Sequence, residues 1–124
     1  MGDVSVPAFP VEVIGGVPVV AAPAEIDITN AEELRAALRQ AAGNGRGPLV
    51  VDLTRTSFCD SAAIHALVDA HKRAQAEGGQ VLLAVSGAAV PRIFELTGLD
   101  RVLSRFGSVA EALGAIPAPG SPGG

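Results

Sequence analysis

The sequence predicts a single α/β domain built on a mostly parallel β-sheet, with a β-hairpin at its start and about four helices. Short apolar runs alternate with segments of helical period, which is the pattern of β-α-β units and therefore of parallel strands. The chain has 124 residues, 48% of them apolar, so it can bury one sizeable core but is too short for two.

The folded part is expected to begin with a hairpin. Val11–Ile14 and Val17–Ala21 are short β-rich runs, and Gly15-Gly16 between them is typical of a tight turn. Pro18 lacks a backbone N–H, so it suits the start of an edge strand better than the middle of a central one.

A first helix is expected to begin at Asn30, which would cap it as half of a capping box with Glu33. Its apolar stripe is Ala31, Leu34, Leu38 and Ala41, and Gly43 and Gly45 would end it.

The remaining elements follow in alternation. Two continuous apolar runs read as strands covered on both faces, at 49–53 and 81–85. Three further helices are expected: one from Ser61 to the stop at Gly78-Gly79, a short one with Pro91 in its first turn that ends at Gly98, and a last one opened by a capping box of Ser108 and Glu111. A short strand is expected at Val102-Leu103. Residues 9–116 would form the domain, and residues 1–8 and 117–124 are poor in core formers and are expected to be disordered.

Composition argues against several classes of function. The net charge is −4, whereas nucleic-acid and anionic-membrane surfaces need clustered Lys and Arg. No apolar run approaches the length of a membrane helix, and the N-terminus does not resemble a secretory signal. The single cysteine, Cys59, cannot form an internal disulfide, which fits the cytoplasm, and we expect it to pack as a small buried hydrophobe. We therefore expect a cytoplasmic protein that binds neither nucleic acid nor membranes.

The loop after the strand at 49–53 is the first candidate for function, because in parallel sheets the working surface lies beyond the carboxyl ends of the strands. It leads into Cys59-Asp60-Ser61-Ala62-Ala63-Ile64 at the start of a helix. This run resembles the motif (apolar)-Asp-Ser-(Ser/Thr/Ala)-Gly-(Leu/Ile) of the STAS domain, and in particular of the bacterial anti-sigma factor antagonists. Two other blocks agree with that family in order: Ala24-Glu25-Ile26-Asp27, and Arg92 to Leu99 (Arg-Ile-Phe-Glu-Leu-Thr-Gly-Leu). Ala63 and Ala24 depart from it, since both stand where the family has glycine.

The resemblance implies a protein that acts by binding another protein and is not an enzyme. Unphosphorylated, it would bind an anti-sigma factor that is also a serine kinase, which frees a sigma factor. Phosphorylation at Ser61 would release it, and a separate serine phosphatase would reset it. The resemblance implies no cofactor, and we expect a monomer when the protein is free. The alternative within the same fold is a small-ligand or nucleotide sensor, or an accessory module of a stressosome or transporter.

The residues of this loop have their own physical chemistry. A phosphate on a serine at a helix N-terminus would be favoured by the helix dipole, while beside Asp60 it would create a dense negative patch toward a partner. Whether Ser61 is the N-cap, or Asp60 is the cap with Ser61 as the first helical residue, stays open at this point. Asp27 is expected on a neighbouring loop at the same end of the sheet, either near the phosphorylation site or as a former of an Asx turn. The expected partner-binding residues are Asp27, Asp60, Ser61, Ala62 and Ile64.

Catalysis and metal binding find little support in the sequence. His65 lies one turn after Ser61 but shares a helix face with Asp69 and Lys72, which is typical of a solvated stripe rather than of a catalytic base. His71 lies six residues further on, at the edge of the predicted core, so the two histidines face different ways and do not predict a zinc site.

Overall fold

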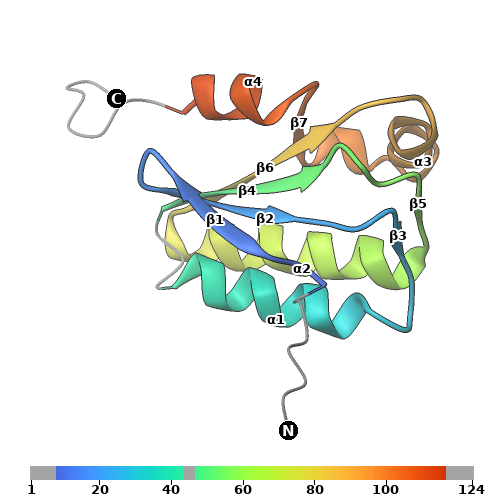
Figure 1. Ribbon diagram of the computed structural model, residues 1–124, viewed down its shortest axis with the longest axis horizontal. Helices are drawn as coiled ribbons and strands as arrows, with labels where there is room; N and C mark the ends of the chain where they lie inside the picture. Colours follow the sequence, from blue (N-terminus) through green and yellow to red (C-terminus); the bar gives the residue numbers. More distant parts are fainter. Residues whose placement is uncertain (1–7, 44–46, 117–124) are drawn as a thin grey trace, which may run out of the picture.

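The computed structural model, which describes residues 8–43 and 47–116, shows a five-stranded sheet between two layers of helices (Figure 1). In chain order the elements are β1 (Val11–Ile14), β2 (Val17–Ala21), β3 (Glu25–Ile26), α1 (Ala31–Ala42), β4 (Pro48–Leu53), β5 (Phe58–Cys59), α2 (Ser61–Glu77), β6 (Gln80–Val85), α3 (Ala89–Thr97), the 3₁₀ turn η1 (Leu99–Arg101), β7 (Ser104–Phe106) and α4 (Val109–Gly114). The strand order is β1-β2-β4-β6-β7, with β1 antiparallel to β2 and every other neighbouring pair parallel. The predicted fold class is confirmed.

The opening hairpin is confirmed, and its turn depends on glycine. Gly15 and Gly16 have φ angles of 59° and 83°, a region that side-chain-bearing residues rarely adopt. The expectation that Pro18 marks an edge strand is wrong, because β2 lies between β1 and β4. Pro18 pairs with Val13 of β1, but it is tolerated in β2 because the register with β4 begins only at Val19, so β4 has no partner at position 18 that would need its N–H.

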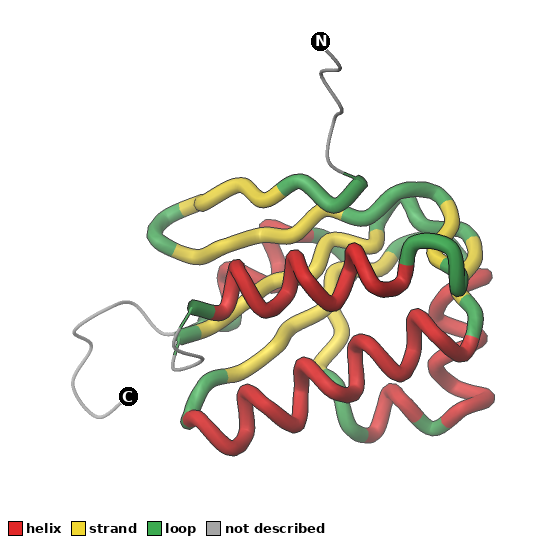
Figure 2. The backbone as a smooth tube through the Cα atoms, turned by 90° about the horizontal axis from the view of Figure 1, so that it is seen from below, coloured by secondary structure: helices red, strands yellow, loops and turns green. Residues whose placement is uncertain are grey.

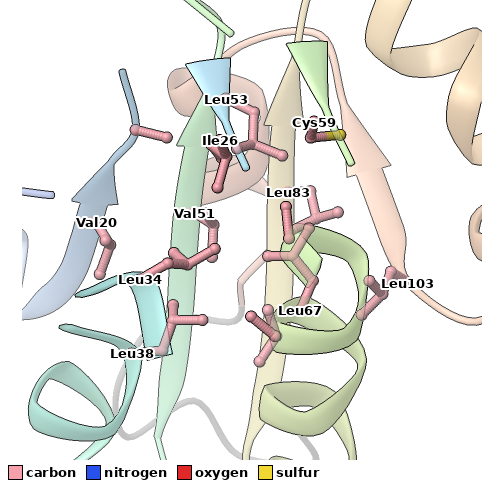
Figure 3. Close-up of a cluster of buried hydrophobic side chains, with 14 of the residues drawn as sticks. Val20, Ile26, Leu34, Leu38, Val51, Leu53, Cys59, Leu67, Leu83 and Leu103 are labelled. Atoms are coloured by element: carbon pink, nitrogen blue, oxygen red, sulfur yellow. The ribbon is translucent and has the colours of Figure 1, made fainter. Parts of the chain in front are cut away.

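The main core lies between the sheet and the layer of α1, α2 and α3. Figure 2 shows α1 and α2 lying along one face of the sheet, and Figure 3 shows Leu34 of α1 and Leu67 of α2 pointing at strand side chains such as Val51. All three side chains are fully buried. Burying a leucine side chain contributes about 1.5–3 kcal/mol, so these contacts fix both helices on the sheet. The opposite face has a smaller core, where Ala112 of the short helix α4 packs over three strand residues: Val19, Val50 and Leu82.

Two expected details near the helices are wrong. The last strand is Ser104–Phe106 rather than Val102-Leu103, because the backbone is still turning there: the Leu103 N–H donates to the Leu99 carbonyl at 2.9 Å. Asn30 precedes α1 but its side chain does not cap it. The Asn30 side chain instead accepts from the Asp27 N–H at 2.9 Å and donates to the Glu25 carbonyl at 3.0 Å, so it closes the preceding loop.

A second, very small sheet was not predicted. β3 and β5 pair in parallel, with Glu25 opposite Phe58 and Ile26 opposite Cys59. Figure 1 shows this pair at the end of the domain where α2 begins. Its role is to hold two loops together, one leading into α1 and the other into α2.

The expected tails are only partly within the described chain. Residues 1–7 and 117–124 lie outside the described residues, whereas Ala8 packs partly buried against the main core. Within 8–43 and 47–116, no helix has both the length and the apolar character needed to cross a membrane.

Candidate functional site

The β3–β5 pair brings the loop that contains Asp27 next to the start of α2. Besides the strand register, the Asp60 N–H donates to the Ile26 carbonyl at 3.1 Å, and the Ile28 N–H donates to Oδ2 of Asp60 at 3.1 Å. Asp27 and Asp60, far apart in the sequence, therefore lie on adjoining loops at one end of the domain, as the sequence predicted.

Asp60, not Ser61, is the N-cap of α2. Its backbone is extended, and its Oδ1 accepts from the N–H groups of Ala62 at 2.9 Å and Ala63 at 3.2 Å. Ser61 is the first helical residue, which settles the alternative that the sequence left open. The helix amides nearest to Ser61 are already bound by Asp60, so a phosphate on Ser61 would benefit from the helix dipole more than from free N–H groups.

The hydroxyl groups of Thr56, Ser57 and Ser61 differ in their exposure and in their hydrogen bonds within the chain. Thr56 is 5% exposed, and its hydroxyl donates to the Pro23 carbonyl at 2.8 Å. The Ser57 hydroxyl donates to the Ala24 carbonyl at 3.3 Å. The Ser61 side chain is exposed at the first turn of α2. Ser61 is thus the hydroxyl of this segment that is best presented to another molecule.

Asp27 shapes its own loop. Its Oδ1 accepts from the Thr29 N–H at 2.9 Å and from the Thr29 hydroxyl. These hydrogen bonds, that of the hydroxyl first, lower the pKa of the Asp27 carboxyl, so it is ionised at neutral pH. The geometry is that of an Asx turn, which was one of the two roles expected for this residue.

The other expected contact residues are less accessible than the sequence suggested. Ala62 and Ile64 are half-buried, and Ile64 packs against the main core. Ala63 is fully buried, so the methyl group that replaces the family glycine points into the core and does not meet an approaching partner.

Sequence reasoning missed two apolar side chains at this end of the molecule. Ile28 is 78% exposed on the loop held by Asp60, and Phe58 of β5 is 46% exposed. The signal that could have found Ile28 is its position between Asp27 and Thr29 in a polar turn, outside any apolar stripe.

Cys59 is buried, as expected. It is 4% exposed, and Figure 3 shows it within the main buried cluster, which also contains Ile26 and Leu53. Burial, and to a smaller degree the negative charge of Asp60, raises the pKa of the Cys59 thiol. A buried thiol with a raised pKa is a poor nucleophile, which supports a packing role.

The helix face with His65 is solvated. His65, Asp69 and Lys72 are exposed, and Asp69 forms an ion pair with Arg35 of α1. His71 is half-buried, as expected for the edge of the core. In the part of the chain that the structure describes, no three histidine, cysteine or acidic side chains are grouped so that they could hold a metal ion.

Comparisons with known proteins agree with this geometry. The family model described as "STAS domain" matches residues 8–112. A protein of Mycobacterium tuberculosis with the provisional name anti-anti-sigma factor Rv2638 is 37% identical over 92 residues, which are 73% of this chain and 62% of Rv2638, so the chain spans less than two thirds of that relative.

Solved structures extend the comparison. An anti-sigma factor antagonist from Mycobacterium paratuberculosis has a TM-score of 0.79 at 30% identity, over 87% of this chain and 92% of its own. The Bacillus protein SpoIIAA has been solved unphosphorylated and phosphorylated. Those structures have TM-scores of 0.68 and 0.65 at 24% and 23% identity, each over 86% of this chain and over 93% and 97% of their own, which shows a shared fold. The chain belongs to the STAS domain family, among its anti-sigma factor antagonists.

Proposed function

We propose that this chain binds an anti-sigma factor through the surface around Ser61, and that phosphorylation of Ser61 by that partner, acting as a serine kinase, ends the binding. Bound to the anti-sigma factor, the chain frees a sigma factor. A serine phosphatase restores the binding form. The chain is a monomer when free, and the exchange takes place in the cytoplasm.

The observation that carries this proposal is the contrast among the three hydroxyl groups. Thr56 is buried and its hydroxyl donates to a backbone carbonyl; Ser57 is exposed but its hydroxyl also donates to one; Ser61 is exposed on the first turn of α2. The Ser61 position also matches the phosphoacceptor of the family motif, and the similar fold of SpoIIAA exists in a phosphorylated form. These points support Ser61 as the acceptor.

The surroundings of Ser61 suit a switch that works by charge. Asp60 precedes it and carries a carboxylate whose oxygens accept from three backbone N–H groups. A phosphate adds about 1.5–2 negative charges, which the helix dipole tolerates within the domain. In an interface matched to a neutral hydroxyl, the same charge loses water without gaining a partner, so binding is expected to weaken.

In this scheme the chain is the substrate of the phosphoryl transfer and not its catalyst. Nucleophilic catalysis by Ser61 would need a base aimed at its hydroxyl in a site that excludes water. His65, one turn along α2, is exposed beside Asp69, so it offers no such site.

The test is phosphorylation with purified anti-sigma factor kinases and ATP, followed by tandem mass spectrometry. We expect one phosphate, on Ser61, and loss of the complex as it accumulates. Ser61→Ala should block labelling while Ser57→Ala, the matched control, keeps it. Labelling confined to Ser57 or Thr56, or a complex that survives full modification of Ser61, would contradict the proposal.

A further inference from the structure

The Asp60 carboxylate joins two parts of the site that are distant in sequence. Oδ1 accepts from the first amides of α2, while Oδ2 accepts at 3.1 Å from the N–H of Ile28, 32 residues earlier. The carboxylate therefore uses both oxygens inside the chain.

The backbone on either side of Ile28 is fixed by successive hydrogen bonds. The Ile28 N–H donates to Asp60 and the Thr29 N–H donates to Asp27. Asn30 closes the turn by accepting from the Asp27 N–H and donating to the Glu25 carbonyl. The loop is thus held in one conformation although it lies at the surface.

The side chain on this fixed backbone is apolar and exposed. Ile28 is 78% exposed, which no other large hydrophobic side chain in the described ranges exceeds. Ile28 belongs to neither hydrophobic core, so packing within the domain does not account for an isoleucine at this position. An apolar side chain on a fixed backbone costs little backbone entropy on binding, and it can anchor an interface by filling a desolvated pocket on the partner.

We infer that Ile28 is an apolar anchor for the protein partner, inserted beside Ser61, and that Asp60 is a positioning residue that holds Ile28 in place rather than a residue that contacts the partner. The inference rests on the proposed function for the identity of the partner, an anti-sigma factor. The matching surface on that partner is an apolar recess next to the groups that meet the Ser61 hydroxyl. The hydrogen bond between Asp60 and Ile28 does not depend on the partner.

Asp60→Asn separates the two roles of the carboxylate. Asparagine is as good an N-cap as aspartate, so its amide oxygen can keep the two bonds to Ala62 and Ala63. Its amide nitrogen is a donor and cannot accept from the Ile28 N–H. The opposite amide orientation would place that nitrogen against two helix N–H groups, which is less favourable. Asp60→Ser provides a second variant, because serine also caps helices but is too short to reach Ile28.

The first measurement is amide hydrogen exchange by NMR on the free protein. A hydrogen bond to a charged group contributes about 1.5–3 kcal/mol, so the Ile28 amide should exchange roughly 10- to 100-fold faster in Asp60→Asn and in Asp60→Ser. The Ala63 amide should keep its protection in Asp60→Asn, and Ser61→Ala, the control, should leave Ile28 unchanged. Unchanged protection of Ile28 in both Asp60 variants would overturn the positioning role.

The second measurement is partner affinity in a double-mutant cycle. Ile28→Ala should bind roughly 10- to 100-fold more weakly than the unsubstituted chain while melting at the same temperature, because the side chain is exposed. Asp60→Asn should also weaken binding, and the double variant should bind no worse than Ile28→Ala. Full affinity in Ile28→Ala overturns the anchor, and additive losses overturn the positioning role of Asp60. If the unsubstituted chain binds no anti-sigma factor, the proposed function fails and the partner assignment with it, while the exchange result still decides whether Asp60 holds Ile28.

Discussion

Ser61→Asp is the sharpest test of a switch that works by charge. Because Asp60 provides the cap of α2, the substitution at Ser61 removes no capping group. A carboxylate in the first turn gains about 0.3–1 kcal/mol from the helix dipole. Repulsion from Asp60, at about 6 Å in water-like surroundings, costs about 0.7 kcal/mol. The two effects nearly cancel, so the melting temperature should stay within about 3 °C of that of the unsubstituted chain.

Binding should respond very differently. A desolvated charge without a partner costs on the order of 2–5 kcal/mol across an interface, which corresponds to a thirtyfold to several-thousandfold loss of affinity. Ser61→Ala adds no charge, so it should bind well and change stability by no more than about 0.5 kcal/mol. Thermal unfolding and calorimetric titration with the anti-sigma factor, on both variants side by side, measure the two effects. If Ser61→Asp unfolds the domain, or binds as tightly as Ser61→Ala, the electrostatic reasoning is refuted.

Three further predictions concern the body of the domain. Native Cys59 should react with a thiol reagent far more slowly than the unfolded chain, and rapid native labelling would show that the thiol is accessible. Leu67→Ala should lower the free energy of unfolding by about 2–5 kcal/mol in denaturant titrations, because it leaves a cavity under α2; a loss below 1 kcal/mol would mean that the site collapses freely. The hydrogen bond from Arg35 lowers the pKa of the Asp69 carboxyl, so this pair should stabilise the fold above about pH 4 and lose its effect as pH falls through the lowered value. NMR titration should show the midpoint of the Asp69 carboxyl rise toward its ordinary pKa in Arg35→Ala, and an unchanged midpoint would argue against the pair.

The parts of the fold that the sequence predicted are those that carry a repeated signal. The continuous apolar runs at β4 and β6 and the helically spaced stripe of α1 each involve several residues, and the double glycine marks the hairpin turn. The position of Ser61 at the start of α2 followed from the same reasoning together with the family motif.

Features that depend on one or two residues, or on tertiary partners, were not predictable in the same way. β3 and β5 are two residues long, which is too short for any period to appear. Asn30 and Asp60 both precede a helix and both could cap it; only the fold decides that Asn30 turns to the Glu25 carbonyl while Asp60 binds the amides of α2. The polar neighbours of Ile28 in the sequence place it in a turn, but that its backbone is held beside the start of α2 by Asp60 depends on the fold.

The pairing of β3 with β5 has a consequence for how the surface comes into existence. The strands lie on either side of α1 and β4 in the sequence, so their pairing requires the chain to close a long loop, which costs conformational entropy. A peptide cut from the start of α2 would contain Ser61 and every neighbour of its motif, yet it would have neither Ile28 nor the strand that holds it. An unfolded chain has the same deficiency. A partner that recognises both loops therefore recognises tertiary structure rather than a linear motif, and it distinguishes folded chains from unfolded ones.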